Sequence, residues 1–123
     1  MFGTRRTVGS TDIEPSMVLA VAEIPEPALD AIDLPTVLAA LADQHRLNIV
    51  AELASSGEVV CGSVDLEVSK ATRSHHFRVL REAGITATRV EGSRRWVSLR
   101  RADLEQRFPG LLDAVLADRR SLA

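Results

Sequence analysis

From residue 33 onward, apolar residues recur three and four positions apart, a spacing that predicts a succession of helices. The first is expected over residues 33–42, because Asp33 is a suitable N-cap and Pro35 suits the first helical turn. A second, mostly apolar helix is expected over residues 43–57, where an aspartate begins it and Ser-Ser-Gly ends it. The short apolar segment 59–66 is expected to form a third, short helix.

The helix that follows, residues 69–84, has clear signals at both ends. The hydroxyl of Ser69 can accept a free amide of the first turn, and Gly84 can adopt the left-handed conformation that ends a helix. Phe77 and Leu80 are expected to face inward, which leaves the basic and polar side chains on the solvent side.

After this helix the pattern changes to that of strands. Residues 85–90 and 95–99 are rich in β-branched and apolar side chains, and they flank a turn at 91–94 that contains a glycine, which predicts a β-hairpin. Two further helices are expected over 101–108 and 109–119. The fold class predicted is therefore mainly α with a small β-hairpin.

The first 32 residues lack this regularity. Residues 1–16 are mixed polar sequence with no sustained period, and residues 18–24 have room for one or two helical turns before two prolines. We therefore expect a flexible N-terminal tail with a short arm over 1–32 and one folded domain over 33–120. The sequence does not indicate what the tail does.

Charge is strongly segregated along the chain, although the net charge is only −2. Residues 1–68 contain three basic and eleven acidic side chains, which gives −8, whereas residues 69–101 contain nine basic and two acidic ones, which gives +7. Most charge clusters are simply solvated surface. Because this one coincides with a capped helix and a hairpin, it favours a surface that attracts a polyanion such as nucleic acid.

Composition excludes several other classes. A chain of 123 residues with 46% hydrophobic and 26% charged residues is typical of one soluble domain, and a single cysteine excludes an internal disulfide framework. The longest early apolar run, residues 17–22, is too short for an export signal or a membrane span. We therefore expect a cytoplasmic protein without a membrane partner. An enzyme would need a pair of acidic residues or a nucleophile beside a base. The sequence shows no such set, and a cysteine with a histidine is the only nucleophilic combination that it offers.

The predicted order of elements is that of a winged helix-turn-helix, in which the N-terminal part of the second helix reads the major groove. The hairpin, or wing, then reaches a flanking minor groove or its phosphates and adds salt-sensitive contacts that ignore sequence. The side chains expected to contact DNA are Lys70, Thr72, Arg73, Ser74, His75, Arg78, Arg89, Arg94 and Arg95.

Three segments resemble the ArsR family of bacterial repressors: LAALAD at 38–43 with Arg46-Leu47, SHHFRVLREAGI at 74–85, and the wing at 92–99. The resemblance covers about two thirds of the chain. It implies a homodimer that binds a partly palindromic double-stranded DNA operator and releases it when an effector binds. It names neither the effector nor a cofactor. Similar proteins commonly have an apolar residue where Arg73 stands, so that side chain either faces outward or is partly buried along its stem.

Two adjacent histidines, His75 and His76, suggest a metal site at first sight. Neighbouring helical positions point about 100 degrees apart, so they do not easily hold one ion, and the family commonly has this pair without a metal role. We expect His76 to pack on a neighbouring helix and His75 to face DNA, with His45 in a surface or capping role. Metal-sensing members have a Cys-x-Cys pair or a set of histidine and carboxylate ligands on the last helix, and neither is present. No metal site is predicted.

Two single side chains allow more than one interpretation. Cys61 is a redox thiol, a ligand shared across a dimer, or a small buried residue, and burial is the commonest fate of a free cysteine. Trp96, on the second strand of the hairpin, either stacks on a base or sugar or packs within its own domain, which is the more frequent outcome.

An apolar stripe on the terminal helices has two possible fates, closure of the monomer core or contact with a second copy. A terminal helix on so small a domain rarely buries five such side chains alone. The chain is therefore expected to dimerise through its terminal helices and the N-terminal arm. The dimer residues proposed are Val18, Leu19, Phe108, Leu111, Leu112, Val115 and Leu116.

The function predicted is that of a sequence-specific DNA-binding transcriptional regulator, a homodimeric repressor released by an unidentified effector. The alternative is a winged helix that binds proteins, or binds DNA without sequence preference, and has no small-molecule effector. Salt-dependent DNA binding without a preferred site would favour that alternative.

Overall fold

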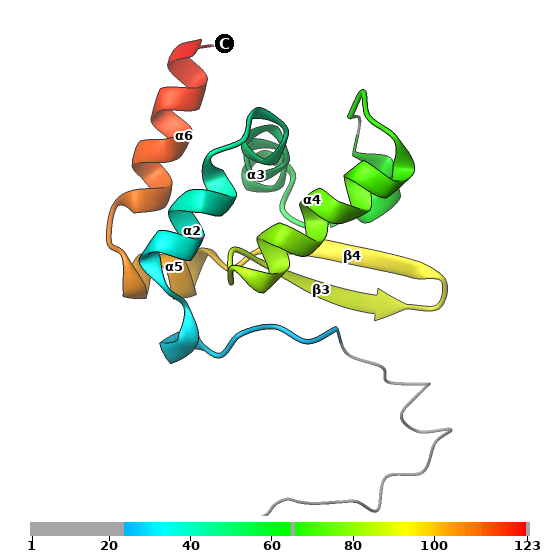
Figure 1. The fold of residues 1–123 in the computed structure, drawn as a ribbon, viewed down its shortest axis with the longest axis horizontal. Helices are drawn as coiled ribbons and strands as arrows, with labels where there is room; N and C mark the ends of the chain where they lie inside the picture. The colour runs from blue at the N-terminus through cyan, green and yellow to red at the C-terminus, as the bar shows by residue number, and fades with distance from the viewer. Residues whose placement is uncertain (1–23, 65, 123) are drawn as a thin grey trace, which may run out of the picture.

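The computed structural model describes residues 24–64 and 66–122, with the side chains of 119–122 left out. Five helices and a small antiparallel sheet make up this part of the chain, which confirms the predicted fold class, a winged helix-turn-helix (Figure 1). In chain order the elements are η1 (Leu29–Ala31), α2 (Leu34–Leu41), α3 (Gln44–Ser56), β2 (Val59–Val60), η2 (Cys61–Ser63), α4 (Lys70–Glu82), β3 (Thr86–Glu91), β4 (Arg94–Leu99), α5 (Arg101–Arg107) and α6 (Leu111–Leu122).

Helices α2, α3 and α4 begin where the sequence predicts, each at a side chain that accepts a free backbone amide of the first turn. Such a cap typically stabilises a helix by about 1 kcal/mol. The acceptors are Asp33, Asp43 and Ser69, and the donors, each at 3.1 Å, are the amides of Thr36, Arg46 and Thr72. The starts of these helices are therefore encoded locally, by one residue each.

The prediction of a short helix over residues 59–66 is wrong. Val59 and Val60 form strand β2, which pairs antiparallel with β4 through Val97 and Trp96, and only one 3-10 turn, η2, follows. β-Branched residues suit a strand, and an open edge of β4 is available to pair with them. Sequence spacing does not reveal that partner, because it lies far along the chain.

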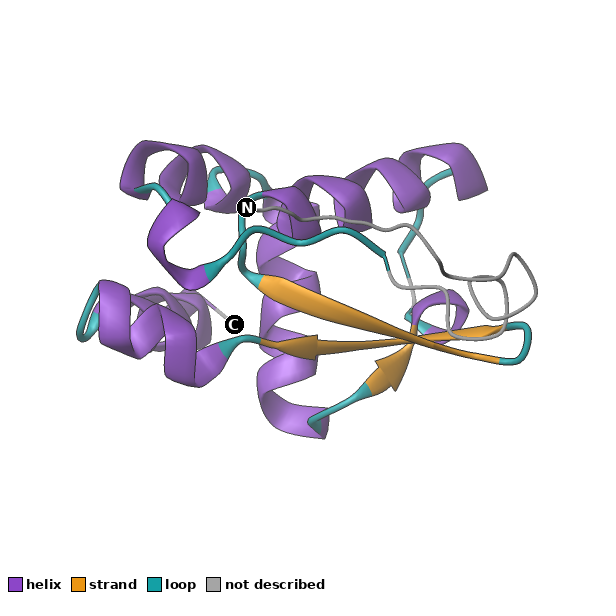
Figure 2. Cartoon of the chain, turned by 90° about the horizontal axis from the view of Figure 1, so that it is seen from below, coloured by secondary structure: helices purple, strands orange, loops and turns teal. Residues whose placement is uncertain are grey.

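The predicted hairpin is confirmed, with Gly92 and Ser93 between its two strands. β4 is the central strand of a sheet with the order β2-β4-β3 (Figure 2). Val97 on β4 is buried and faces the helices, and the residues on either side of it point to the opposite face. The hairpin is therefore anchored by its inner face and extends to the turn at Gly92.

The hydrophobic core lies where the helices meet the inner face of the sheet. Phe77 and Leu80 are buried, as predicted for the inner side of α4. The largest side chains with less than 2% exposure include Ile32, Ile49, Leu53, Leu80, Ile85 and Val97. Helix α4 and the β3–β4 hairpin therefore share one core, so neither moves freely with respect to the other.

The N-terminal segment, defined here as residues 24–32, is part of this fold. Ile32, which the sequence analysis assigned to the arm, is 1% exposed and belongs to the core. Arg100 donates a hydrogen bond to the carbonyl of Pro27 at 2.7 Å, and Arg107 donates one to the carbonyl of Ile32. The carboxylate of Glu26 accepts the amide of Thr88 on β3. The rest of the predicted arm lies outside the described residues.

Candidate nucleic-acid interface

Helix α4 presents a polar face to solvent. Lys70, Ser74, His75 and Arg78 are exposed, and Thr72 at the first turn is exposed as well. Figure 1 shows the N-terminal end of α4 and the turn of the β3–β4 hairpin at the same side of the molecule. The two elements that carry the basic residues therefore point the same way, which is the arrangement that two neighbouring grooves of a duplex require.

Arg73 lies differently from the other predicted readers. It is half-buried and stands three and four positions before His76 and Phe77, which are both buried, so it starts on the inner face of α4. Its charge is close enough to Cys61 to affect that thiol. Of the two alternatives that the sequence left open, partial burial is the one that the structure favours.

Arg94 and Arg95 at the end of the wing are exposed. Arg89, the third predicted wing contact, is held in place instead. Its guanidinium binds Glu58 at 2.9 Å and Glu91 at 3.5 Å. The hydrogen bond from Arg89 lowers the pKa of Glu58 and in turn raises the pKa of Arg89. Since this contact joins residues 31 positions apart, no local pattern in the sequence predicts it.

Trp96 packs within its own domain, the more frequent of the two outcomes considered. The guanidinium of Arg89 lies over the indole ring at 5.5 Å from its centroid. Arg89 and Trp96 are register partners on β3 and β4, so their side chains share the outer face of the sheet. Arg89 therefore occupies one face of the indole ring.

Cys61 is half-buried in η2, between the inner side of α4 and the wing. Burial raises the pKa of the Cys61 thiol, and the charges of Arg73 and Arg95 oppose that effect without overcoming it. A thiol in this state is a poor nucleophile, because the thiolate is the reactive form. The geometry therefore favours a packing role over a redox role.

We expect Cys61 to react slowly with iodoacetamide at pH 7, and its alkylation rate to rise with pH to a midpoint above the ordinary value of 9.0. Each unit by which the pKa rises lowers the thiolate fraction at pH 7 about tenfold. Mild peroxide should leave DNA affinity almost unchanged. The guanidine-unfolded protein, which should react at the ordinary rate, is the control. Fast alkylation of the folded protein together with a reversible loss of DNA binding would make Cys61 a redox sensor.

His76 is 6% exposed, as expected for packing on a neighbouring helix. Its Nδ1 lies 3.1 Å from Nη1 of Arg46 on α3, and its ring is 5.5 Å from the ring of His45, centroid to centroid. Within residues 24–64 and 66–122, no three side chains of His, Cys, Asp or Glu are grouped so that they could hold a metal ion. In the same residues, no helix is both long and apolar enough to cross a bilayer.

The predicted dimer stripe divides between two surroundings. Leu112 and Leu116 are 4% and 7% exposed and pack in the core of the single chain, so they close the monomer. Phe108, Leu111 and Val115 are half-buried at the edge of that core. Val18 and Leu19 lie outside the described residues. Part of the stripe therefore closes the monomer core, and the rest stays partly exposed in the single chain.

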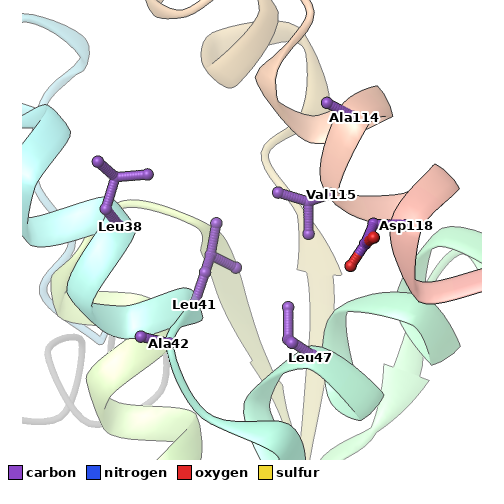
Figure 3. Close-up of a pocket in the computed structure, with 7 residues that line it drawn as sticks. All are labelled: Leu38, Leu41, Ala42, Leu47, Ala114, Val115 and Asp118. Carbon is purple, nitrogen blue, oxygen red and sulfur yellow. The ribbon is translucent and has the colours of Figure 1, made fainter. Parts of the chain in front are cut away.

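An open apolar groove of about 350 Å³ runs between α2, α3 and α6, and Val115 points into it (Figure 3). Leu38, which lines the groove, and Leu34 one turn before it on α2 are 48% and 41% exposed. Sequence reasoning did not single out these two leucines, because helical spacing predicts a helix without showing which of its apolar residues stay uncovered. The residues that line the groove are Leu38, Leu41, Ala42, Leu47, Ala114, Val115 and Asp118.

The fold and this surface define a winged helix-turn-helix protein, with the exposed polar face of α4 and a basic wing on one side. A sequence profile described as "Bacterial regulatory protein, arsR family" matches residues 43–86, which span α3 to the start of β3. This is the part of the chain that holds the reading helix.

Individual proteins agree with the profile. The "Uncharacterized HTH-type transcriptional regulator YceK" of Bacillus subtilis is 43% identical over 79 residues, 62% of this chain and 79% of that protein. The "Arsenical resistance operon repressor" of Staphylococcus aureus is 35% identical over 75 residues, 59% of this chain and 71% of that protein. The "Cadmium resistance transcriptional regulatory protein CadC homolog" of Staphylococcus aureus is 40% identical over 70 residues, 55% of this chain and 58% of that protein. The chain belongs to the arsR family of bacterial transcriptional regulators.

Proposed function

We propose that this regulator is a homodimeric repressor that inserts α4 into the major groove of a two-part operator and releases it when an effector binds. The observation that carries the proposal is the exposed polar face of α4 beside a basic wing that points the same way. The site serves binding and not catalysis, and the protein acts where the chromosome is, in the cytoplasm.

Within this proposal there are two kinds of DNA contact, those that recognise base edges and those that bind the phosphate backbone. Ser74, His75 and Arg78 on the exposed face of α4 read base edges, with Lys70 and Thr72 at adjacent phosphates. Arg94 and Arg95 hold the flanking backbone. Arg73 supports the first turn of α4 from its half-buried position, and Arg89 supports the wing by covering Trp96.

The apolar groove and the exposed leucines of α2 supply the dimer contact in this proposal. They lie between α2 and α6, away from the turn of the wing (Figure 1). A second copy related by a twofold axis would cover Leu34, Leu38 and Val115 of each chain. The two reading helices would then lie about 34 Å apart, one turn of DNA.

The effector we propose is not a soft metal ion held by several thiolates of one subunit. Two relatives have names that refer to arsenical and cadmium resistance. This chain has one cysteine in all, and that thiol is half-buried with a raised pKa. Soft metals prefer several thiolate ligands, which a single subunit of this protein does not offer.

Selection of preferred sites from random duplexes tests the proposal most directly. The expected result is a site with two related half-sites about ten base pairs apart, centre to centre. Repeating the selection with zinc, nickel, copper or peroxide should leave the result unchanged if no metal or oxidant is the effector. Salt-dependent binding to every duplex alike would instead favour the alternative, a module for protein contact or non-specific DNA binding.

Ser74→Ala and Arg94→Ala are expected to weaken DNA binding in different ways. Loss of the Ser74 hydroxyl should reduce the preference for operator over random DNA by about 1 to 3 kcal/mol, because a base-edge contact is lost. Loss of the Arg94 guanidinium should weaken binding to both DNAs almost equally and lower the salt dependence, because a phosphate contact is lost. Titration of labelled operator and scrambled duplexes at several salt concentrations measures both effects. Equal losses on both DNAs for Ser74→Ala would refute its assignment as a reader.

A further inference from the structure

Arg46, in the first turn of α3, links three helices. Its Nε donates a hydrogen bond to the carbonyl of Ala40 near the end of α2, at 2.6 Å. Its Nη1 lies 3.1 Å from Nδ1 of His76 on α4. Its backbone amide donates to the carboxylate of Asp43, the N-cap of α3. The guanidinium of Arg46 thus joins the end of α2 to the middle of α4, while its backbone amide takes part in the N-cap of α3.

The chemistry of the Arg46–His76 contact determines the state of the imidazole. A guanidinium has only donors, so Nδ1 of His76 must accept, and the hydrogen of the neutral ring is on Nε2. A second proton would sit on Nδ1 and remove the only acceptor. It would also place a positive charge 3.1 Å from the Arg46 cation. Protonation of His76 therefore breaks the link between α3 and α4.

The groups around His76 keep the ring neutral. Burial lowers the pKa of His76, and the cation of Arg46 and the rings of His45 and His75 act in the same direction. The carboxylate of Asp43 opposes them without overcoming burial. Since the unfolded chain titrates near 6.5, folding favours the neutral ring above that pH. The stability gained from this state is full above pH 6.5 and is lost as the pH falls through the lowered pKa.

His76 follows directly after two exposed residues of the proposed reading face, Ser74 and His75. Its side chain is the point where the reading helix is hydrogen-bonded to α3. We infer that Arg46 and His76 are positioning residues that set the rotation of α4 about its axis, so that operator binding requires a neutral His76. This inference rests on the proposed role of α4 as the reading helix.

The positioning role predicts that operator binding weakens as the pH falls, which is opposite to the effect of an ordinary histidine that contacts DNA. A proton on an ordinary histidine at a DNA surface adds a positive charge that strengthens attraction to phosphates. His75 is exposed on the same helix. A proton on His76 turns the reading face instead and weakens operator binding. Comparing substitutions of these two neighbouring histidines therefore distinguishes a positioning role from a simple charge effect.

The test compares wild type with His76→Asn, whose amide oxygen takes roughly the place of Nδ1 and does not titrate. Operator dissociation constants are measured from pH 8 downward at constant ionic strength, over the range in which circular dichroism shows folded protein. The imidazole nitrogens of His76 are followed by NMR in the same samples. Below the pKa so measured, Kd of wild type relative to His76→Asn should rise with a slope that approaches tenfold per pH unit. His75→Asn, the matched control on the same helix, should retain this acid loss.

Arg46→Lys provides a second variant, because an ammonium cannot reach both Ala40 and His76 with the geometry of a guanidinium. It should weaken operator binding at neutral pH and flatten the acid loss. Identical pH profiles for wild type and His76→Asn, or a neutral His76 ring with its hydrogen on Nδ1, would overturn the inference.

NMR keeps this test separate from that of the proposed function. In the free protein, the amides of Ser74 and Arg78 should titrate with the pKa of His76 in wild type and not in His76→Asn. If neither protein prefers any DNA site at neutral pH, the proposed function fails while this readout still decides whether the pair positions α4. Absence of that shared titration refutes the positioning role, whatever DNA the protein binds.

Discussion

Leu38→Glu is expected to disrupt the proposed dimer and to weaken operator binding about 100-fold or more, since linking two half-site contacts typically gains 10²–10⁴ in affinity. Leu38 is 48% exposed in the single chain, so a glutamate there stays hydrated in the monomer and leaves its fold intact. In the proposed dimer the same carboxylate would be buried against the apolar groove, at a cost of several kcal/mol.

Sedimentation equilibrium gives the oligomeric state, and binding is compared between a full operator and an isolated half-site. The variant should bind the half-site as wild type does and lose affinity only for the full operator. Gln106→Glu, which adds the same charge at an exposed position of α5, serves as the control. If Leu38→Glu stays dimeric, the partner surface lies elsewhere and the groove has another role.

Gly84→Ala is expected to lower the free energy of unfolding by about 3 kcal/mol, at the upper end of ordinary point substitutions. Two causes add. Gly84 has φ +87°, a left-handed conformation that costs an alanine roughly 1 kcal/mol. In addition, a Cβ there would lie 2.6 Å from Cγ1 of Ile32 and 3.3 Å from Cγ of Pro27, so the N-terminal segment must shift.

Gly110→Ala separates these two causes. Gly110, directly before α6, has nearly the same φ, +85°, but a Cβ there has nothing within 4 Å. It should therefore lose only the backbone part, about 1 kcal/mol. Urea denaturation of both variants measures the difference, which reports the close approach of Ile32 to the end of α4. Equal losses for the two would mean that Ile32 moves aside without cost.

Local signals account for what the sequence predicted correctly. The caps at Asp33, Asp43 and Ser69 and the glycine after α4 act on amides three or four residues away, so they are legible in the sequence itself. The inward side of α4 followed from helical period alone. These signals were enough to find the reading helix and the hairpin beside it.

What the sequence did not predict depends on partners far along the chain. Val59 and Val60 become a strand because β4 offers them an edge, and Arg89 is bound because Glu58 reaches it across the sheet. Ile32 is core because Gly84 leaves room for it. The same limit applied to Leu34 and Leu38, since helical spacing does not show which apolar face of α2 stays uncovered.

The N-terminal segment also affects how this domain is cut from the chain for experiment. The family match begins at residue 43, yet Ile32 fills the core, and Pro27 and Ile32 supply the carbonyls that Arg100 and Arg107 bind. A fragment that starts at residue 33 would leave both guanidinium groups without these acceptors and a hole beside Gly84. The smallest part of the chain that folds on its own thus begins well before the region that matches the family.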